Sequence, residues 1–149
     1  MVLPFPKPPK RGKKPKKRLP NKRMRQRRAK AKCLDLWGKV IRAKGPCVFT
    51  GKLVGRKWHE RCDTPLQGMH CLPKGAYPAL RLHLENGLPG CAEIHMYYTC
   101  HPEEFGLFLR QYWGEDKTEE MLTLARTQIK IDYEAELVVL EEKAREYGL

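Results

Sequence analysis

Apolar side chains recur at helical spacing between residues 29 and 44, and a Gly–Pro pair then ends the run. This spacing predicts an amphipathic helix whose apolar stripe packs on the rest of the domain. The stripe consists of Leu34, Trp37, Val40 and Ile41. Three more helices are expected after Pro102, in the segments EEFGLFLRQYW, KTEEMLTLARTQ and DYEAELVVLEEKAREYG, and Asp132 suits the N-cap of the last.

The segment between these helices has the pattern of short strands and turns. CVFTG and GRKWHERC contain β-forming residues flanked by glycine, and LQGMHCLPKG follows them. In ALRLHL, leucines alternate with Arg81 and His83, which predicts a strand with one buried face. ENGLPG is expected to be a loop, and CAEIHMYYTC is expected to begin a helix. Strands and helices in this order predict an α+β fold.

The last expected helix carries apolar or small side chains at steps of four and three. These residues are Tyr133, Leu137, Leu140, Ala144 and Tyr147. Such a heptad seam packs either on its own domain or against the same helix of a second subunit. The sequence leaves both alternatives open, so a homodimer through the C-terminal helices is a candidate assembly.

Positive charge is concentrated in the first part of the chain. The net charge is +13, and residues 1–32 hold fifteen Lys or Arg, no Asp or Glu, and six of the twelve prolines. With few apolar side chains to bury, residues 1–28 are expected to form a disordered arm that binds nucleic acid through phosphate contacts. A solubilising tail or a nuclear-import-like signal is the alternative. The basic residues chosen for phosphate contacts are Lys13, Lys14, Lys16, Lys17, Arg18, Arg23, Arg25, Arg27 and Arg28.

The remaining charge is also uneven. Residues 33–101 carry nine basic and five acidic residues, whereas residues 102–149 carry six basic and twelve acidic residues. DNA is therefore expected to meet the first of these parts and avoid the second. No stretch is apolar and long enough to span a bilayer, and the N-terminus lacks the apolar core of a secretory signal. Six cysteines in such a chain suggest reduced thiols or metal ligands, and a cytoplasmic protein is expected.

Three side chains suit phosphodiester hydrolysis: His70, Asn86 and His95. A hairpin, a loop and a helix in this order would bring them to one point. An imidazole titrates near neutral pH, so His70 can accept a proton from water. His95 can hold a divalent ion beside the scissile phosphate, and Asn86 can either brace the loop by hydrogen bonds or bind the ion through its oxygen.

These residues carry a resemblance to a known motif. GMHCLPKG…LENGLPGCAEIH resembles the HNH motif, in which an Asn is followed by Cys at the fifth position and His at the ninth, as in Asn86, Cys91 and His95. Residues 33–149, about four fifths of the chain, resemble the NinG (Rap) recombination endonucleases of lambda-like phages. LDLWGKVIRAKGPCVFTGK is similar to the opening helix and knuckle of that family, and the closing helices follow its layout.

The resemblance implies a ββα-metal core, made of a β-hairpin and a helix, over residues 29–101. An N-terminal helix, C-terminal helices over residues 102–149 and the basic arm would flank it. It also implies an endonuclease that uses Mg²⁺ or Mn²⁺ to cut branched DNA, such as Holliday junctions, during phage recombination. By position, His70 would be the general base, Asn86 the loop residue and His95 the metal ligand, with Asn86 as a second candidate ligand.

Two other functions remain open beside this one. A generic HNH nickase or packaging nuclease would act on ordinary duplex DNA. A non-catalytic DNA-binding protein would keep the fold and lose the chemistry. Its best support is that Met69 stands where many HNH enzymes have an acidic metal ligand, and Gln67 nearby is also uncharged. His83, His101 and Asp63 are candidate replacements that the sequence does not rank.

The cysteines depart from the resemblance as well. Related domains often hold zinc with two Cys-x-x-Cys pairs, whereas Thr50 and Ile94 replace the second cysteine of each pair here. No structural zinc is therefore expected. The alternative is a rearranged site in which Cys47 and Cys91 join Cys62, Cys71 or Cys100.

Other side chains have both a functional and a structural interpretation. Lys74, Arg81, Arg56 and Lys57 would hold phosphates beside the site or belong to a solvated surface. Trp58 would stack on an unpaired base or, as its strand-like neighbours favour, lie in the core.

Overall fold

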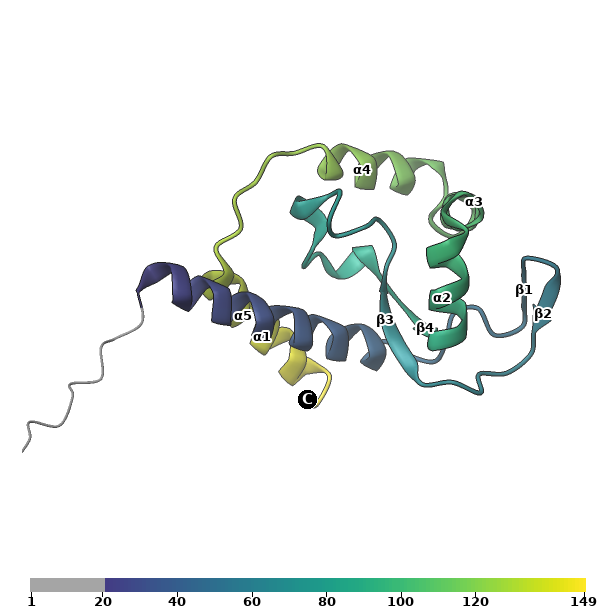
Figure 1. The fold of residues 1–149 in the computed structure, drawn as a ribbon, viewed down its shortest axis with the longest axis horizontal. Helices are drawn as coiled ribbons and strands as arrows, with labels where there is room; N and C mark the ends of the chain where they lie inside the picture. The colour runs from purple at the N-terminus through teal and green to yellow at the C-terminus, as the bar shows by residue number, and fades with distance from the viewer. Residues whose placement is uncertain (1–20) are drawn as a thin grey trace, which may run out of the picture.

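The computed structural model describes residues 21–149, which form five helices and two small antiparallel hairpins (Figure 1). The α+β class is confirmed. In chain order the elements are α1 (Lys22–Ala43), β1 (Lys52–Val54), β2 (Lys57–His59), β3 (Leu66–His70), the 3₁₀ turns η1 (Pro78–Leu80) and η2 (Leu84–Asn86), β4 (Gly87–Cys91), α2 (Ala92–Cys100), α3 (Pro102–Trp113), α4 (Glu115–Ala125) and α5 (Tyr133–Glu146). No helix in this part of the chain is both long and apolar enough to cross a membrane.

Helix α1 begins earlier than the apolar stripe predicts. The side chain of Asn21 caps it by accepting a hydrogen bond from the backbone N–H of Met24 at 3.0 Å. Lys, Arg, Gln and Ala then continue the helix, since all four favour helical backbone, and Ala29 is already buried. The prediction of disorder is therefore wrong for residues 22–28. The rest of the proposed arm lies outside the described residues.

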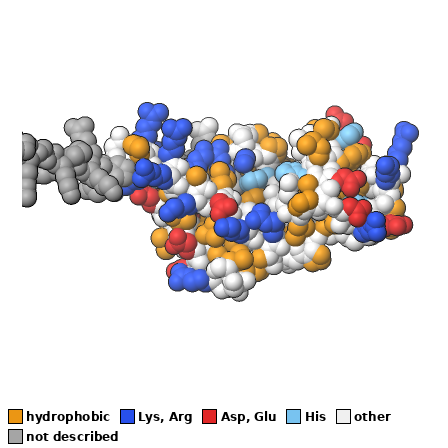
Figure 2. All heavy atoms as spheres, turned by 60° about the horizontal axis from the view of Figure 1, so that its bottom comes forward, with side chains coloured by type: hydrophobic (Ala, Val, Ile, Leu, Met, Phe, Trp, Pro, Cys, Tyr) orange, Lys and Arg blue, Asp and Glu red, His pale blue; other side chains and the backbone are white. Residues whose placement is uncertain are grey.

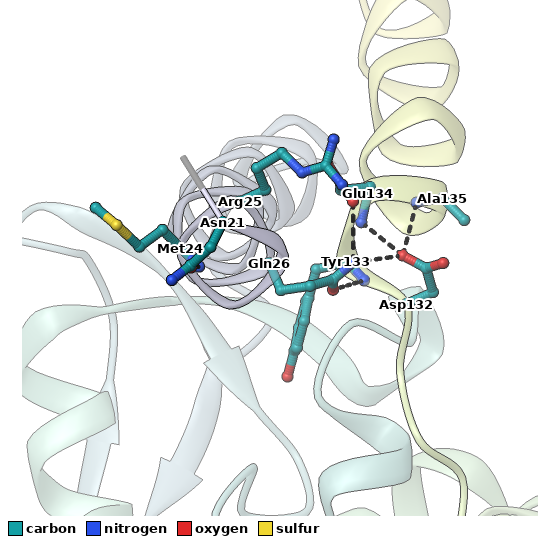
Figure 3. A network of polar contacts seen from close by, with 8 residues as sticks. All are labelled: Asn21, Met24, Arg25, Gln26, Asp132, Tyr133, Glu134 and Ala135. Atoms are coloured by element: carbon teal, nitrogen blue, oxygen red, sulfur yellow. Dashed lines mark hydrogen bonds and ion pairs between the residues drawn. The ribbon is translucent and has the colours of Figure 1, made fainter. Parts of the chain in front are cut away.

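Helices α1 and α5 lie side by side and are tied together near their N-termini (Figure 3). The Gln26 amide donates to Asp132 Oδ1 at 2.9 Å and to Glu134 Oε2 at 3.2 Å, and its oxygen accepts from the backbone N–H of Tyr133 at 3.0 Å. Leu140 is buried in the same cluster as Trp37 of α1.

The heptad seam of α5 is thus occupied by α1 of the same chain. Tyr133 and Leu137 pack against that cluster too, and Ala144 is 3% exposed. Of the two alternatives left open by the sequence, packing on its own domain is the one that the structure displays. Tyr147, at the end of the seam, is 40% exposed.

The β3–β4 hairpin forms the centre of the molecule. It is antiparallel, with His70 opposite Gly87 and Leu66 opposite Cys91, and α2 follows β4 without a break. The expectation that residues 85–90 form a loop is wrong from Gly87 onward. The composition GLPG is typical of loops, but every residue of β4 is buried and the strand pairs along its whole length with β3.

The predicted strand at residues 79–84 is also wrong. Pro78 begins a 3₁₀ turn, and backbone bonds from Arg81 N to Pro78 O and from His83 N to Leu80 O continue the tight turns. Leu80 packs against α4, whereas Leu82 packs against α1. The alternating leucines therefore fill two separate clusters instead of one face of a strand.

Glycines allow α1 to approach one face of the central hairpin closely. A Cβ atom on Gly87 would lie 2.6 Å from Trp37 Cζ2, and one on Gly68 would lie 3.3 Å from Gly38 Cα. On the other side of the hairpin, Met69 is buried with side chains of α2, α3 and the segment before β1. The hairpin is thus held between two groups of elements.

The β1–β2 hairpin stands at one edge of the molecule (Figure 1). Its strands have three residues each, and only Val54 and His59 are buried. Trp58 is 60% exposed, so the prediction that it belongs to the core is wrong. Trp37 is 2% exposed, as expected for a core residue.

Candidate functional site

A groove of about 850 Å³ lies between α1, β3, residues 71–77, α2 and α3. Both His70 and His95 line it, together with Gln67, Arg42 and Lys74. None of its lining residues is Asp or Glu. On the face that Figure 2 shows, histidine side chains reach the surface near the middle, with Lys and Arg side chains to their left and hydrophobic side chains to their right. The groove therefore combines two imidazoles with positive charge.

His70 ends β3 and is held from two sides. Its ring stacks on Trp37, with the centroids 3.8 Å apart and an angle of 11° between the planes. Nε2 donates to the backbone carbonyl of Arg81 at 2.9 Å. Burial is the largest cause that lowers the pKa of His70, and the positive charges of Lys74, His95 and Arg81 lower it further, against the opposing carbonyl bond. At neutral pH the ring is uncharged, with its proton on Nε2.

His95 lies in the first turn of α2 and faces β3. Nδ1 donates to Oε1 of Gln67 at 2.7 Å. Burial and then the charge of Lys74 lower the pKa of His95, so this ring is also neutral at neutral pH. A hydrogen bond to one nitrogen fixes the tautomer and leaves the lone pair on the other nitrogen.

The second nitrogens, Nδ1 of His70 and Nε2 of His95, have no hydrogen-bond partner within residues 21–149. Within the same residues, the one side-chain nitrogen or oxygen that is both buried and without a partner is Nδ1 of His83. The two free nitrogens of His70 and His95 are therefore exposed to solvent. Both lone pairs are therefore accessible, and both residues line the same groove. A free, oriented imidazole nitrogen suits a general base or a metal ligand.

Asn86 is buried behind the residues that line the groove and holds them in place. The residue is 0% exposed. Its oxygen accepts from the backbone N–H of Leu72 at 2.7 Å, and its amide donates to the carbonyls of Leu72 at 3.0 Å and Leu80 at 3.1 Å. These bonds brace residues 71–80 and leave the oxygen inaccessible. The geometry therefore fits the bracing role of Asn86. The prediction that Asn86 is a metal ligand is wrong, because its oxygen is buried and already bonded.

The predicted phosphate contacts differ in their placement. Lys74 is exposed at the groove. Arg81 is not free to contact phosphate. It donates to the Tyr133 hydroxyl at 2.6 Å and to the Lys74 carbonyl at 3.2 Å, and so it holds the loop that contains Lys74. Arg42 lines the groove and was not singled out from the sequence, because nothing there distinguishes it from other basic helix residues.

The basic residues of the N-terminal segment fall into two groups. Arg23, Arg27 and Arg28 are exposed on α1, and Arg25 lies 3.8 Å from Glu134 in an exposed ion pair. Lys and Arg side chains gather at this end of the molecule in Figure 2. The others, Lys13, Lys14, Lys16, Lys17 and Arg18, lie outside the described residues.

None of the three candidates to replace the missing acidic ligand lines the groove. Met69 is 1% exposed and belongs to the core. Asp63 pairs with Arg61 at 3.0 Å, and Nδ1 of His101 donates to the carbonyl of Tyr97 at 2.8 Å. His83 does not line the groove either. Beside hydroxyl and thiol groups, the lining offers two imidazoles and one amide and no carboxylate. Such a set fits Mg²⁺ or Mn²⁺ poorly, because these ions prefer carboxylate and other oxygen ligands.

A second set of metal-ligand side chains lies elsewhere, beside the β1–β2 hairpin. Ligand atoms of Cys47, His59, Cys62 and Cys91 all lie within 4.8 Å of one another, and we call this set the Cys/His cluster. The expectation of no zinc site rested on the missing Cys-x-x-Cys pairs. The alternative from the sequence, in which Cys62 joins Cys47 and Cys91, names three of these four residues. The overlooked residue is His59, and the overlooked signal is its His59-x-x-Cys62 spacing.

The chain matches none of the family models, curated proteins or solved structures with which it was compared.

Proposed function

We propose that the protein is a DNA endonuclease that hydrolyses a phosphodiester bond held in the groove. The observation that carries the proposal is the pair of neutral imidazoles, His70 and His95, each with one free nitrogen and both lining one groove. The strand–strand–helix order of β3, β4 and α2 agrees with the ββα core that the resemblance implies. Hydrolysis needs a base beside a bound phosphate, and the groove offers imidazoles together with cations that would hold one.

The charge of the groove favours a polyanion. Arg42 and Lys74 line it, and carboxylates are absent from its lining. Exposed Arg23, Arg27 and Arg28 extend the positive surface along α1. Cations placed along a surface in this way bind phosphates without reading sequence. DNA backbone therefore suits the groove better than a neutral or positively charged substrate.

His70 is assigned as the general base. Its Nδ1 is free to take a proton from the attacking water, while Nε2 stays bonded to the Arg81 carbonyl. That carbonyl becomes a stronger partner once the ring is positively charged. Stacking on Trp37 keeps the ring in one plane during the transfer. General base catalysis of this kind contributes about 10²–10⁴-fold to a rate.

His95 is assigned to the metal: its free Nε2 would hold a divalent ion, which would stabilise the negative charge that develops on the phosphate. Gln67 fixes the tautomer that this role requires. Because the donor set does not fit Mg²⁺ or Mn²⁺, we derive no step through either ion. Ions that accept imidazole, such as Zn²⁺, Ni²⁺ and Co²⁺, belong in the test beside them.

Branched DNA is the proposed substrate, on the strength of the resemblance. Cutting ordinary duplex, as a nickase or packaging nuclease would, is the alternative within the same chemistry. A third function is favoured by a specific observation: the groove lacks a carboxylate, and Gln67 occupies one nitrogen of His95. A protein with these features that binds DNA without cutting it would keep the fold and the positive groove.

A cleavage assay separates the three functions. Wild-type protein, His70→Ala and His101→Ala are incubated with a labelled four-way junction and with linear duplex, each in a series of Mg²⁺, Mn²⁺, Zn²⁺, Ni²⁺ and Co²⁺. His101 is an exposed histidine outside the groove, so its variant is the matched control. The proposal expects junction cleavage by wild type and the control, and loss in His70→Ala. Binding without cleavage by wild type in every ion would leave the non-catalytic function.

A further inference from the structure

The Cys/His cluster joins three separate parts of the chain. Cys47 follows α1, His59 ends β2 with Cys62 three residues later, and Cys91 ends β4. His59 Nε2 lies 3.4 Å from Cys62 Sγ and 3.5 Å from Cys91 Sγ. Cys47, His59 and Cys91 are at most 8% exposed, whereas Cys62 closes the cluster from the solvent side.

We propose that this cluster is a structural Zn²⁺ site with three thiolates and one imidazole as ligands. Zn²⁺ takes four N or S ligands in a tetrahedron, and bond lengths of about 2.0–2.3 Å place donor atoms about 3.3–3.8 Å apart. The two distances from His59 fall in this range. A full set of four ligands leaves no open position, as in a site whose role is structural.

The partners of His59 support a metal further. Its ring is buried, and the hydrogen-bond partners of its Nε2 among residues 21–149 are the thiols of Cys62 and Cys91, which are weak partners. Burying an imidazole against such partners costs free energy unless a stronger interaction compensates. Coordination supplies that interaction. Cys71 and Cys100, which the sequence offered as alternative ligands, are outside the cluster.

The β1–β2 hairpin is too small to be stable without additional contacts, which a bound metal would supply. Two strands of three residues are marginal by themselves, and the cross-strand pair Leu53 and Trp58 adds no buried core because each residue is 60% exposed. A metal bound by His59 and Cys62 on one side, and by Cys47 and Cys91 on the other, would hold the hairpin on the body. Cys91 immediately precedes α2, so the same ion would fix the start of the helix that carries His95.

The test measures zinc in the purified full-length protein by elemental analysis, after dialysis without chelator. Wild type and Cys100→Ser are expected to retain about one zinc per chain, and Cys62→Ser to lose it. Cys100 is the matched control, since it is also exposed and lies outside the cluster. His59→Cys should keep zinc, whereas His59→Ala should not.

A second readout keeps the inference falsifiable if a variant folds poorly. Replacing zinc by Co²⁺ in the wild type should give the visible absorption of a tetrahedral ion with intense sulfur-to-cobalt charge-transfer bands. Wild-type protein that contains no zinc, gives no such cobalt spectrum and has the same melting temperature with and without EDTA would overturn the inference. A disulfide among these cysteines, found by mass spectrometry without reductant, would overturn it as well.

The outer face of the β1–β2 hairpin carries an independent observation. Leu53 and Trp58 are directly opposite each other and equally exposed. Lys52, Arg56 and Lys57 are exposed around them, and the segment 49–58 contains no acidic residue. An exposed indole beside cations is the pattern that binds unpaired bases, because the ring stacks on the base while the cations hold the phosphates.

We infer that this face binds unpaired bases of single-stranded or branched DNA, with Trp58 as the stacking residue. The inference rests on the DNA partner of the proposed function and not on its chemistry. The other faces of the hairpin are occupied: Val54 is buried, and a Cβ on Gly55 would lie 2.7 Å from Cζ of Tyr97 in α2. Only the Leu53–Trp58 face is left to meet a partner.

Binding of a labelled oligothymidine and of blunt duplex is measured by anisotropy, with wild type, Trp58→Ala, Trp58→Phe and Leu107→Ala. Leu107 is 66% exposed on α3 and is the matched apolar control. Trp58→Ala should weaken oligothymidine binding about tenfold, since stacking of one base contributes about 1–3 kcal/mol. Trp58→Phe should lose less, and Leu107→Ala nothing.

The outcomes keep the two proposals apart. Equal affinity of Trp58→Ala and wild type for oligothymidine would overturn the hairpin inference and leave the groove untouched. If wild type binds neither DNA, the DNA partner of the proposed function fails as well. An equal loss in duplex affinity would mean that Trp58 does not read unpaired bases.

Discussion

The groove and the Cys/His cluster both contain histidine, but they differ in what their imidazoles are free to do. In the groove, His70 and His95 each have one nitrogen bonded to protein and one accessible, beside Lys74 and with no carboxylate nearby. In the Cys/His cluster, His59 is buried and its nitrogen faces thiols. The first region has open positions for a substrate, and the second has its ligands closed around one point.

This difference separates chemistry from structure. A catalytic site keeps a position open for a reactant, whereas a structural metal site uses all its positions for protein ligands. We therefore assign reactivity to the groove and stability to the cluster. Both regions use histidine, so the role of each histidine can be assigned only from the residues around it.

The largest expected effects come from removing one imidazole from each region. His95→Ala should slow junction cleavage at least about 10²-fold, since it removes an oriented group beside the phosphate, and its melting temperature should stay close to that of wild type. His59→Ala should lower both the melting temperature and the zinc content. Calorimetry, elemental analysis and single-turnover cleavage measure all three quantities. A His59→Ala variant with normal stability and zinc would remove the distinction between the regions.

Asn86→Ala should destabilise the protein next most strongly. It removes three hydrogen bonds and leaves the backbone N–H and C=O of Leu72 without their partner, whereas the Leu80 carbonyl keeps the bond from the His83 N–H. One unsatisfied buried group costs about 1–3 kcal/mol. Urea unfolding should therefore show a loss of several kcal/mol, while zinc content stays normal. Wild-type stability in this variant would contradict the bracing role.

Gly87→Ala should cost about 1–3 kcal/mol of unfolding free energy, as overpacking of a tight core does. The new Cβ would lie 2.6 Å from Trp37 Cζ2, so α1 and the residue that stacks on His70 would both shift. Gly106→Ala is the matched control, because it lies in α3 and its Cβ would meet nothing within 4 Å. Equal stabilities of the two variants would show that α1 packs less closely on the hairpin.

The pH dependence of cleavage should reflect a neutral base. Burial and the charges of Lys74, His95 and Arg81 lower the pKa of His70 from its ordinary value of 6.5. The neutral, reactive ring therefore persists at lower pH than in an exposed histidine. The single-turnover rate should fall only as the pH drops below 6.5 and be level above it. A rate that keeps rising well above that value would point to a different base.

Lys74→Gln should have the smallest of these effects. Lys74 is exposed at the groove and is expected to contact phosphate without reading bases. Its loss should weaken binding to all DNA substrates alike and reduce the salt slope by about one. Anisotropy at several salt concentrations measures this change. Lys130→Gln, in an exposed segment outside the groove, is the control.

Two features of the structure could be predicted from the sequence: most of the helices, and the placement of His70 and His95 in one region. The stripe of α1 and the segments after Pro102 form helices because their apolar side chains repeat with the helical period. His70 and His95 line one groove, as a hairpin followed by a helix would place them. Both results depend on local periodicity or on short connections.

The errors concern features set by tertiary contacts. The residues of β4 have the composition of a loop, and only their pairing with β3 and their burial make them a strand. Leu80 and Leu82 alternate, but they pack into different clusters. His59 joins Cys47 and Cys91 across more than ten residues in each direction, and no local pattern carries that proximity.

The most direct test of the account is the single-turnover rate of four-way junction cleavage by folded, zinc-loaded wild type and His70→Ala, in the ion that supports the fastest reaction. Wild type is expected to cut the junction, and His70→Ala to cut it about 10²–10⁴-fold more slowly with unchanged junction affinity. Equal rates for the two proteins, or no cleavage by wild type in any ion, would contradict the assignment of the groove as an active site.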